Sequence, residues 1–442
     1  MSAVGWSQPN RAPQPPAATP TTRRVSDASK HTQQTVTPSR PDSLAPPILV
    51  GATYVLVYVL GAIDASVDPD MLGPRLRYNL IWYEGVSIAG LAYLFAGYAL
   101  FTLGFYARLG TPPAATPHNE THRYNPRRAS WLTTILFLSL FGFLLLYTLQ
   151  QGYGRFQGSG QTGLENLSLL GEMSIVPFGL GLYRFMLDKG NRLSTISRWD
   201  TWFLWLVMFP CQVGFSVFTG TRSRLLGILI MVLAAYHYGH QQLRPRSLLL
   251  VTFAIVTLFM PGIALLRTDA ASRPDVNLGF IWESMMDRTS ALEGFTIAFE
   301  HPDDTPEPDP LYQVFVSGLV PRLIWPDKPL STWGERFTLW ATGQPVTWAS
   351  PGLPGELLLD FGYAGGLLAM LMLGILWRRL FLWLGSPSGE ASGFIYIVLL
   401  PVLLQTEVGF VSPYSMLLRL LAVSTVVYLL VREVPTINAD SV

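Results

Sequence analysis

Residues 357–378 read LLLDFGYAGGLLAMLMLGILWR, an apolar run with one carboxylate, Asp360, near its start and one arginine at its end. An α-helix rises about 1.5 Å per residue, so about 20 apolar residues cross the hydrocarbon core of a bilayer. The run therefore predicts a membrane-spanning helix whose acidic end lies close to one membrane surface.

The composition of the whole chain indicates a membrane protein. Of its 442 residues, 50% are apolar and 13% are charged, and the mean hydropathy is +0.33, whereas a soluble domain carries about 25% charged residues. The net charge of +1 argues against a nucleic-acid partner, which would favour a basic surface. The one cysteine, Cys211, excludes an intrachain disulfide and a cysteine-cluster metal site.

The same apolar pattern recurs along the chain and predicts an all-α, polytopic integral membrane protein with about ten transmembrane helices. Prolines inside some of these spans are tolerated, because neighbouring helices can satisfy the backbone groups that a proline frees. The predicted spans are 44–63, 82–106, 130–149, 167–187, 201–219, 225–240, 247–266, 357–378, 392–409 and 412–431.

The spans divide the chain into four regions. Residues 1–43 are rich in Pro, Ser, Thr and Gln and have no apolar core, which predicts a disordered cytoplasmic tail. Residues 44–266 contain the first seven spans, and residues 267–356 form one large extracytoplasmic loop. Residues 357–442 contain the last three spans and a short cytoplasmic C-terminus.

The distribution of cations predicts which side each loop faces, because cytoplasmic loops carry an excess of Lys and Arg. The excess falls on the inner side when both termini are cytoplasmic. The inner segments then hold Arg108, Arg123, Arg127, Arg128, Arg184, Lys189, Arg192, Arg198, Arg244, Arg246, Arg378 and Arg379. The short outer loops hold Arg75, Arg77, Arg155, Arg222 and Arg224.

Ionisable residues within spans are costly and are therefore functional candidates. In this topology they gather toward the outer face, whereas a transporter more often carries its polar groups near the midplane. Glu356 and Asp360 are spaced i, i+4 and so share one helical face. The other members of this group are Glu84, Glu172, Glu407, Arg419, and the pair Arg222 and Arg224 in TGTRSRLLG.

Each of these charges also has a structural interpretation. A carboxylate can hold helices together through an ion pair, and Glu407 and Arg419 are predicted to form such a pair. If Arg222 and Arg224 are both helical, their side chains diverge by about 200°, so at most one points at a ligand. The acidic run EHPDDTPEPD at 300–309 has the ligands for a divalent ion, but a solvated acidic turn explains it better, and we predict no metal site.

The large loop contains a predicted amphipathic helix. Apolar residues recur at helical spacing over 281–299, which would allow the helix to lie flat at the lipid surface. Arg288 falls on the same stripe, either as an arginine that extends to the interface or as a cation directed at a lipid phosphate. The stripe consists of Ile281, Met285, Leu292, Phe295 and Phe299.

A stiff, cationic stretch follows in the same loop, LVPRLIWPDKP at 319–329. Each of its three prolines fixes a backbone angle, so the loop loses little entropy when it becomes ordered. Arg322, Lys328 and Arg336 are thereby held near fixed positions. The tryptophans of this region form either an interfacial belt or a set of flat rings that stack on sugars; they include Trp325, Trp333 and Trp340.

Three motifs, in this order, resemble the oligosaccharide repeat-unit polymerases, the Wzy-type O-antigen polymerase family. GTRSRLLGILI at 220–230 is similar to the start of the helix that follows the family's arginine motif. LVPRLIWPDKP is similar to its proline-rich stretch, and GELLLDFGYAGGLL at 355–368 is similar to its GE…(N/D)FG…G helix opening. The first half of the chain matches only as a multispan membrane protein.

The resemblance implies a helical lipid-sugar glycosyltransferase in the bacterial inner membrane, which makes the large loop periplasmic. Its substrate would be an undecaprenyl-diphosphate-linked oligosaccharide, polymerised into O-antigen or exopolysaccharide without a cofactor. A chain-length regulator and a flippase are compatible protein partners. A ligase for the finished polymer and a flippase or exporter of the lipid-linked sugar are alternatives.

The chemistry of that reaction assigns roles to the candidate residues. An acceptor hydroxyl attacks the anomeric carbon, and charge grows on the departing diphosphate, which arginine forks bind best. The candidate bases are Glu356, then Asp360 and Glu172. The candidate diphosphate ligands are Arg222, Arg288 and Arg322, supported by Arg224, Lys328 and Arg336.

Overall fold

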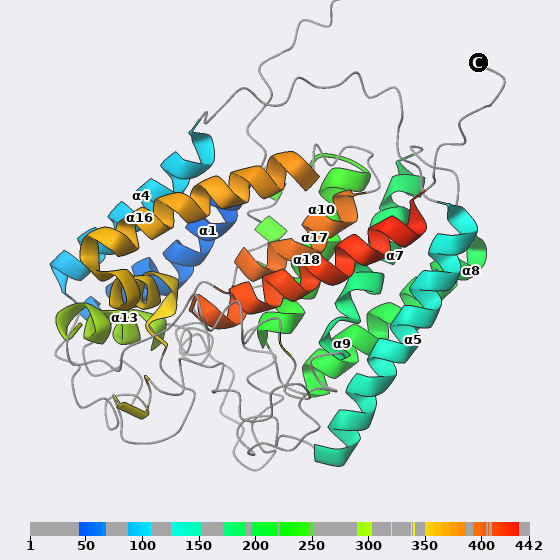
Figure 1. The fold of residues 1–442 in the computed structure, drawn as a ribbon, viewed down its shortest axis with the longest axis horizontal. Helices are drawn as coiled ribbons and strands as arrows, with labels where there is room; N and C mark the ends of the chain where they lie inside the picture. Colours follow the sequence, from blue (N-terminus) through cyan, green and yellow to red (C-terminus); the bar gives the residue numbers. More distant parts are fainter. Residues whose placement is uncertain are drawn as a thin grey trace, which may run out of the picture. The chain divides into compact units, whose positions relative to one another are not determined.

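The computed structural model of the chain describes ten stretches of sequence and a few single positions between them. Every element that it describes is a helix (Figure 1), which confirms the all-α prediction for this part of the chain. The stretches are 44–67, 87–107, 125–151, 171–190, 196–218, 222–244, 290–302, 350–384, 392–403 and 409–432, and the single positions fall within 246–254, 320, 337–340 and 405.

Two of the helical rods contain a π-helical turn. The first rod runs through α1 (Pro46–Tyr54), η1 (Val55–Val59) and α2 (Leu60–Val67), and the second through α8 (Arg198–Phe203), η2 (Leu204–Met208) and α9 (Phe209–Phe218). The other helices are α4 (Ile88–Tyr106), α5 (Pro126–Gln151), α7 (Ile175–Lys189), α10 (Arg222–Gly239), α13 (Ser290–Glu300), α16 (Gly352–Leu384), α17 (Gly393–Leu403) and α18 (Val411–Val431).

Five of the described helices are long and apolar enough to cross a membrane, and they coincide with five of the ten predicted spans. Helices α7, α9 and α17 overlap three more predicted spans but are shorter than those spans, and α10 covers most of the predicted span 225–240. The predicted span 247–266 falls almost wholly outside the described residues. The chain is therefore a helical membrane protein by length and composition of its helices, and the number ten remains a prediction. The five are Pro46–Ile63, Ile88–Tyr106, Pro126–Leu146, Gly352–Leu384 and Ser412–Val431.

Helices α4 and α16 pack at very short range, side by side along much of their length (Figure 1). A Cβ atom added to Gly104 would overlap the carbonyl oxygen of Leu371, and one added to Gly374 would overlap that of Phe101. The two glycines therefore let each backbone touch the other, which is how small residues drive helix association where lipid removes the hydrophobic force.

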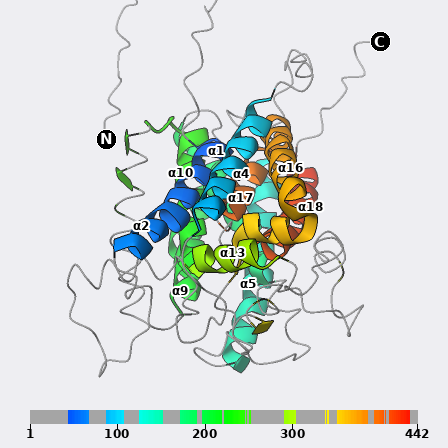
Figure 2. The same cartoon turned by 90° about the vertical axis from the view of Figure 1, so that its left-hand side faces the viewer.

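Helix α17 is the centre of the bundle. All of its residues, from Gly393 to Leu403, are buried, and it packs against α7, α10 and α18, between α10 and α18 in the view of Figure 2. Pro401 lies inside the helix and against Gly227 of α10. A helix that is apolar on all sides suits this position, because every face meets another helix.

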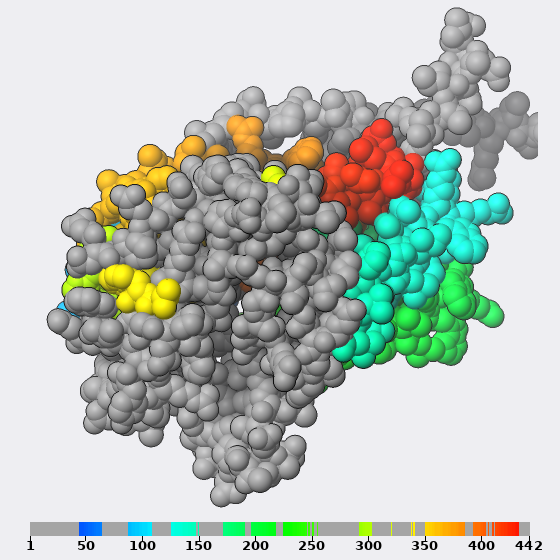
Figure 3. All heavy atoms as spheres, turned by 60° about the horizontal axis from the view of Figure 1, so that its bottom comes forward, coloured from blue at the N-terminus to red at the C-terminus, as the bar shows by residue number. Residues whose placement is uncertain are grey.

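Hydrogen bonds connect the helix ends at one end of the bundle, which we call the basic end. Arg378 of α16 donates to the carbonyl oxygen of Phe105 at the end of α4 (2.8 Å), and Asn125 before α5 donates its N–H to Val431 of α18 (2.9 Å). The surfaces of α5 and α18 meet accordingly in Figure 3, where α18 is red and α5 cyan. Arg184 of α7 pairs there with Asp200 of α8. The predicted cytoplasmic cations that the structure describes thus share one end.

Helix α13 is the described part of the predicted amphipathic helix, and residues 281–289 lie outside the described residues. Its residues 291–298 are buried, and the ring of Phe295 stacks on Tyr93 of α4 with centroids 6.1 Å apart. Tyr363 of α16 donates its hydroxyl to the carbonyl oxygen of Phe299 (2.7 Å). The apolar stripe therefore packs on protein, across the ends of α4 and α16 (Figure 2), instead of lying on lipid.

Helix α16 begins at Gly352, five residues before the predicted span, and breaks at Gly362. The φ angle of Gly362 is 69°, in the left-handed region that glycine adopts at no steric cost. Glu356 and Asp360 both precede the break, one helical turn apart. The predicted boundary between loop and span, at residues 356 and 357, falls within this first helical segment of α16 and stays a prediction.

The contact between α4 and α16 can be tested with single methyl groups. We expect Gly374→Ala to destabilise the protein by about 1–3 kcal/mol, because the methyl must push two backbones apart. Gly142→Ala on α5 is the matched control, since nothing lies within 4 Å of its added Cβ. Thermal unfolding in detergent measures both, and equal midpoints for the two variants would contradict the close packing.

Candidate functional site

The structure describes the side chains of five of the predicted site residues: Glu172, Arg224, Trp340, Glu356 and Asp360. For Arg222 it describes only the backbone, at the first position of α10. The remaining predicted site residues lie outside the described residues: Arg288, Arg322, Trp325, Lys328, Trp333 and Arg336.

Arg224 turns into the bundle toward α9. One terminal nitrogen, Nη2, donates to the side-chain oxygen Oε1 of Gln212 at 2.9 Å. The guanidinium group lies over the ring of Phe215, 4.6 Å from its centroid, in a cation–π contact. Its Nε is buried without a hydrogen-bond partner among the described residues. The residue is therefore held in place by an amide and a ring, with donor capacity to spare.

A chain of polar contacts continues from Gln212 into the core. Gln212 is fully buried, and its Nε2 donates to the hydroxyl of Ser174, at 2.9 Å, just before α7. The hydroxyl of Ser216 donates in turn to the backbone oxygen of Gln212 at 2.8 Å. We did not predict a role for Gln212, although a single amide inside an apolar span is a signal for a buried hydrogen bond between helices.

Glu172 supplies the negative charge of this group. It lies within electrostatic reach of the guanidinium groups of both Arg224 and Arg419, the latter on α18. The sequence paired Arg419 with Glu407, which lies outside the described residues. We call Glu172, Ser174, Gln212, Arg224 and Arg419 the arginine cluster. Two of these five residues are arginines, and one is a carboxylate.

Glu356 occupies a separate position at the start of α18. Its carboxylate oxygen Oε2 accepts the backbone N–H of Phe410, one residue before the helix. Gly409 has a φ angle of 118°, and a Cβ added there would overlap the same carboxylate. With 3% of its surface exposed, Glu356 joins the first segment of α16 to α18. This contact fits the structural interpretation of that carboxylate.

Asp360 and the arginine cluster lie toward the same end of the bundle, opposite the basic end. Asp360 is half-buried, one turn beyond Glu356. Arg419 lies eight residues into α18, or about 12 Å along the helix axis from Val411. The structure thus places Glu172 and Arg224 within electrostatic reach of each other, and it places Glu356 at the start of α18, about two helical turns from Arg419.

Trp340 is the one predicted sugar-stacking residue within the described part of the chain. It is half-buried, and its ring lies 5.7 Å from that of Phe337. The described residues contain no group of three His, Cys, Asp or Glu side chains that could hold a metal ion.

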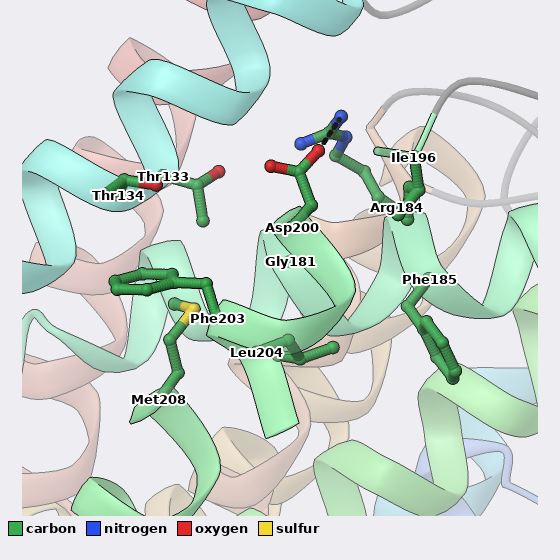
Figure 4. Close-up of a pocket in the computed structure, with 10 residues that line it drawn as sticks. All are labelled: Thr133, Thr134, Gly181, Arg184, Phe185, Ile196, Asp200, Phe203, Leu204 and Met208. Atoms are coloured by element: carbon green, nitrogen blue, oxygen red, sulfur yellow. Dashed lines mark hydrogen bonds and ion pairs between the residues drawn. The ribbon is translucent and has the colours of Figure 1, made fainter. Parts of the chain in front are cut away.

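A small pocket at the basic end contains a buried ion pair (Figure 4). Arg184 Nη2 lies 3.4 Å from Asp200 Oδ2 and 3.4 Å from the carbonyl oxygen of Pro126. The hydroxyl of Ser130 donates to the same carboxylate. The free volume of about 10 Å³ holds no more than one water molecule. This site joins α5, α7 and α8 and is too small for a substrate.

Asp200 was not among the predicted site residues, but its sequence context contained a signal. Ser197 and Asp200 form a capping box at the start of α8, in which each side chain accepts the other residue's backbone N–H. Ser-x-x-Asp at the start of an apolar run is a pattern of this kind. The same carboxylate therefore caps one helix and pairs with an arginine of another.

In the comparisons with known proteins, no family model, curated protein or solved structure matches the chain.

Two substitutions at Glu356 test whether its carboxylate anchors α16 to the start of α18. Glu356→Gln keeps a side-chain oxygen that can accept the Phe410 N–H, whereas Glu356→Ala removes it. We expect Glu356→Ala to cost about 1.5–3 kcal/mol of stability, as for a hydrogen bond to a charged group, and Glu356→Gln to cost clearly less. Thermal unfolding in detergent shows which variant is less stable, and an equal loss of stability in both would argue against the anchoring contact.

Proposed function

We propose that the chain is a membrane glycosyltransferase that polymerises undecaprenyl-diphosphate-linked oligosaccharide repeat units at the periplasmic face of the bacterial inner membrane. The observation that carries the proposal is the arginine cluster, in which the guanidinium groups of Arg224 and Arg419 lie within electrostatic reach of Glu172, away from the basic end. Arginine forks that gather in one place bind phosphate oxygens well, and the leaving group of this reaction is a diphosphate.

The reaction requires that the negative charge on the leaving group be stabilised. The acceptor hydroxyl oxygen bonds to the anomeric carbon of the donor chain, the bond from that carbon to the phosphate oxygen breaks, and undecaprenyl diphosphate departs with the electron pair. Groups that bind this charge more tightly than the ground state lower the barrier. Arg224 fits this role because Gln212 and Phe215 already fix its orientation.

The loop cations complete the proposed site. Arg322, Lys328 and Arg336 follow the prolines of the periplasmic loop, and Arg288 precedes α13. We propose that they close over the diphosphate, with Arg222 at the start of α10 beside it. Trp325, Trp333 and Trp340 would then offer flat surfaces to the sugars.

Three carboxylates are candidates for the base that takes the acceptor proton. Glu172 belongs to the arginine cluster, and Asp360 is more exposed than Glu356, whose oxygen holds the Phe410 N–H. We therefore favour Asp360 and Glu172 over Glu356. The base must come within about 3 Å of the acceptor hydroxyl.

The alternatives differ in what they require of the bundle. A ligase uses the same leaving group, so the arginine cluster serves it equally well. A flippase or exporter requires polar groups along a path through the membrane. The central helix α17 carries no ionisable side chain other than Tyr396 and is buried throughout, which favours the enzyme.

A deletion of the gene separates the three functions. A polymerase leaves single repeat units on the lipid carrier in the outer leaflet of the inner membrane, whereas a ligase leaves long chains there. A flippase leaves single units in the inner leaflet. We expect the first pattern, and recovery of either of the other two would replace the proposal.

Substitution of Arg224 tests the site itself. We expect Arg224→Ala to lower polymer formation by about a hundredfold or more, by analogy with loss of an oxyanion donor. Arg224→Lys should recover only part of it, because an ammonium cannot form a bidentate fork. Arg379→Ala, an exposed arginine at the basic end, is the control. Polymer ladders from complemented cells with matched protein levels provide the measurement, and a normal ladder in Arg224→Ala would exclude this residue from the site.

A further inference from the structure

The basic end carries a repeated surface pattern that the proposed reaction does not use. On α5, Arg127 precedes Trp131 by four residues, and on α8, Arg198 precedes Trp202 by four. Both arginines are exposed, and the two indoles are 70% and 62% exposed, respectively. Trp199, next to Arg198, is 64% exposed. We call Arg127, Trp131, Arg198, Trp199 and Trp202 the Arg–Trp band.

The two halves of the band lie on neighbouring helices. Ser130 of α5 donates to Asp200 of α8, and the rings of Phe137 and Phe203 meet edge to face with centroids 6.1 Å apart. Figure 1 shows α5 and α8 together at the edge of the bundle. The inward sides of the two helices are used in these contacts, so the band lies on their outward sides.

The spacing matches the layers of a bilayer surface. Residues i and i+4 lie on one helical face, about 6 Å apart along the axis. In each pair the arginine is nearer the helix end and the tryptophan is one turn closer to the apolar part. A phosphate layer outside an indole layer has the same order, because tryptophan prefers the interface just within the headgroups.

The charges around the band leave it positive. The carboxylate of Asp200 is used by Arg184 and Ser130 in the pocket of Figure 4. Arg128 and Lys189 are exposed nearby, and Asp188 is half-buried at the end of α7. The exposed cations therefore outnumber the carboxylates among the described residues of this surface, and zwitterionic headgroups alone would not balance them.

We infer that the Arg–Trp band binds the phosphate groups of anionic phospholipids in the leaflet at the basic end. Each arginine contacts a headgroup phosphate, and each tryptophan lies below it against the glycerol and upper acyl region. This interaction does not depend on the proposed glycosyl transfer. Each basic residue close to an anionic membrane surface contributes about fivefold to binding, and salt weakens the effect.

The test uses the full-length protein in nanodiscs of phosphatidylcholine with an increasing fraction of phosphatidylglycerol. Lipid retained by the protein after extraction is counted by native mass spectrometry, and the thermal unfolding midpoint is recorded at each composition. We expect the wild-type protein to retain phosphatidylglycerol selectively and its midpoint to rise with the phosphatidylglycerol fraction, less so at high salt. Equal retention of the two lipids would overturn the inference.

Matched variants locate the effect. We expect Arg127→Gln with Arg198→Gln to lose more than tenfold in selective retention, and Arg127→Lys with Arg198→Lys to keep most of it. The control is Arg244→Gln with Arg246→Gln, exposed arginines with no tryptophan one turn away. The Lys pair also shows that the positions tolerate substitution. A loss in the control as large as in the Gln pair would overturn the assignment to the band.

Discussion

A polar or charged side chain inside a helical bundle without bulk water must have a partner, because the free energy of leaving it unpaired is several kcal/mol. This constraint explains much of the described interior. Arg224 has Gln212 and Phe215, Gln212 has Ser174, and Arg184 has Asp200. In each case the partner comes from another helix or from the residues just before one, so satisfying the charge also fixes which helices are neighbours. The arginine cluster follows the same rule, because Glu172, just before α7, lies within electrostatic reach of Arg224 of α10 and Arg419 of α18.

The positions of the long helices could be predicted from the sequence, but the contacts between helices could not. Apolar runs and their lengths are local properties, so α1, α4, α5, α16 and α18 could be located from sequence. The start of α16 was missed because Gly352, Pro354 and Gly355 indicate a loop, although here they begin a helix packed on α13. Gln212 was missed because a single amide gives no sign of which residue it will meet. The side on which each cation lies, by contrast, follows from counting the predicted spans along the chain. The described cations of the predicted cytoplasmic segments do lie at one end of the bundle.

Two candidate residues that the sequence placed toward the outer face, Glu172 and Arg224, lie within electrostatic reach of each other in the structure. The choice of Glu356 as first base rested on helical spacing, which does not reveal that the turn at Gly409 presents a backbone N–H to this carboxylate. The pair of Arg419 with Glu407 stays a prediction, because Glu407 lies outside the described residues, whereas Glu172 lies far from Arg419 in the chain and within its electrostatic reach in the fold. Long-range proximity of this kind requires coordinates.

The break at Gly362 divides α16 into two mechanical parts. Beyond it, Gly374 locks the helix to α4 through backbone contact; before it, the short segment with Glu356 and Asp360 touches α13 and the turn that opens α18. The change of direction at this one glycine turns the acidic segment away from the axis of the rod that α4 holds. One helix can therefore pack along α4 with one part and reach α13 and the start of α18 with the other, through a residue that has no side chain to obstruct the turn.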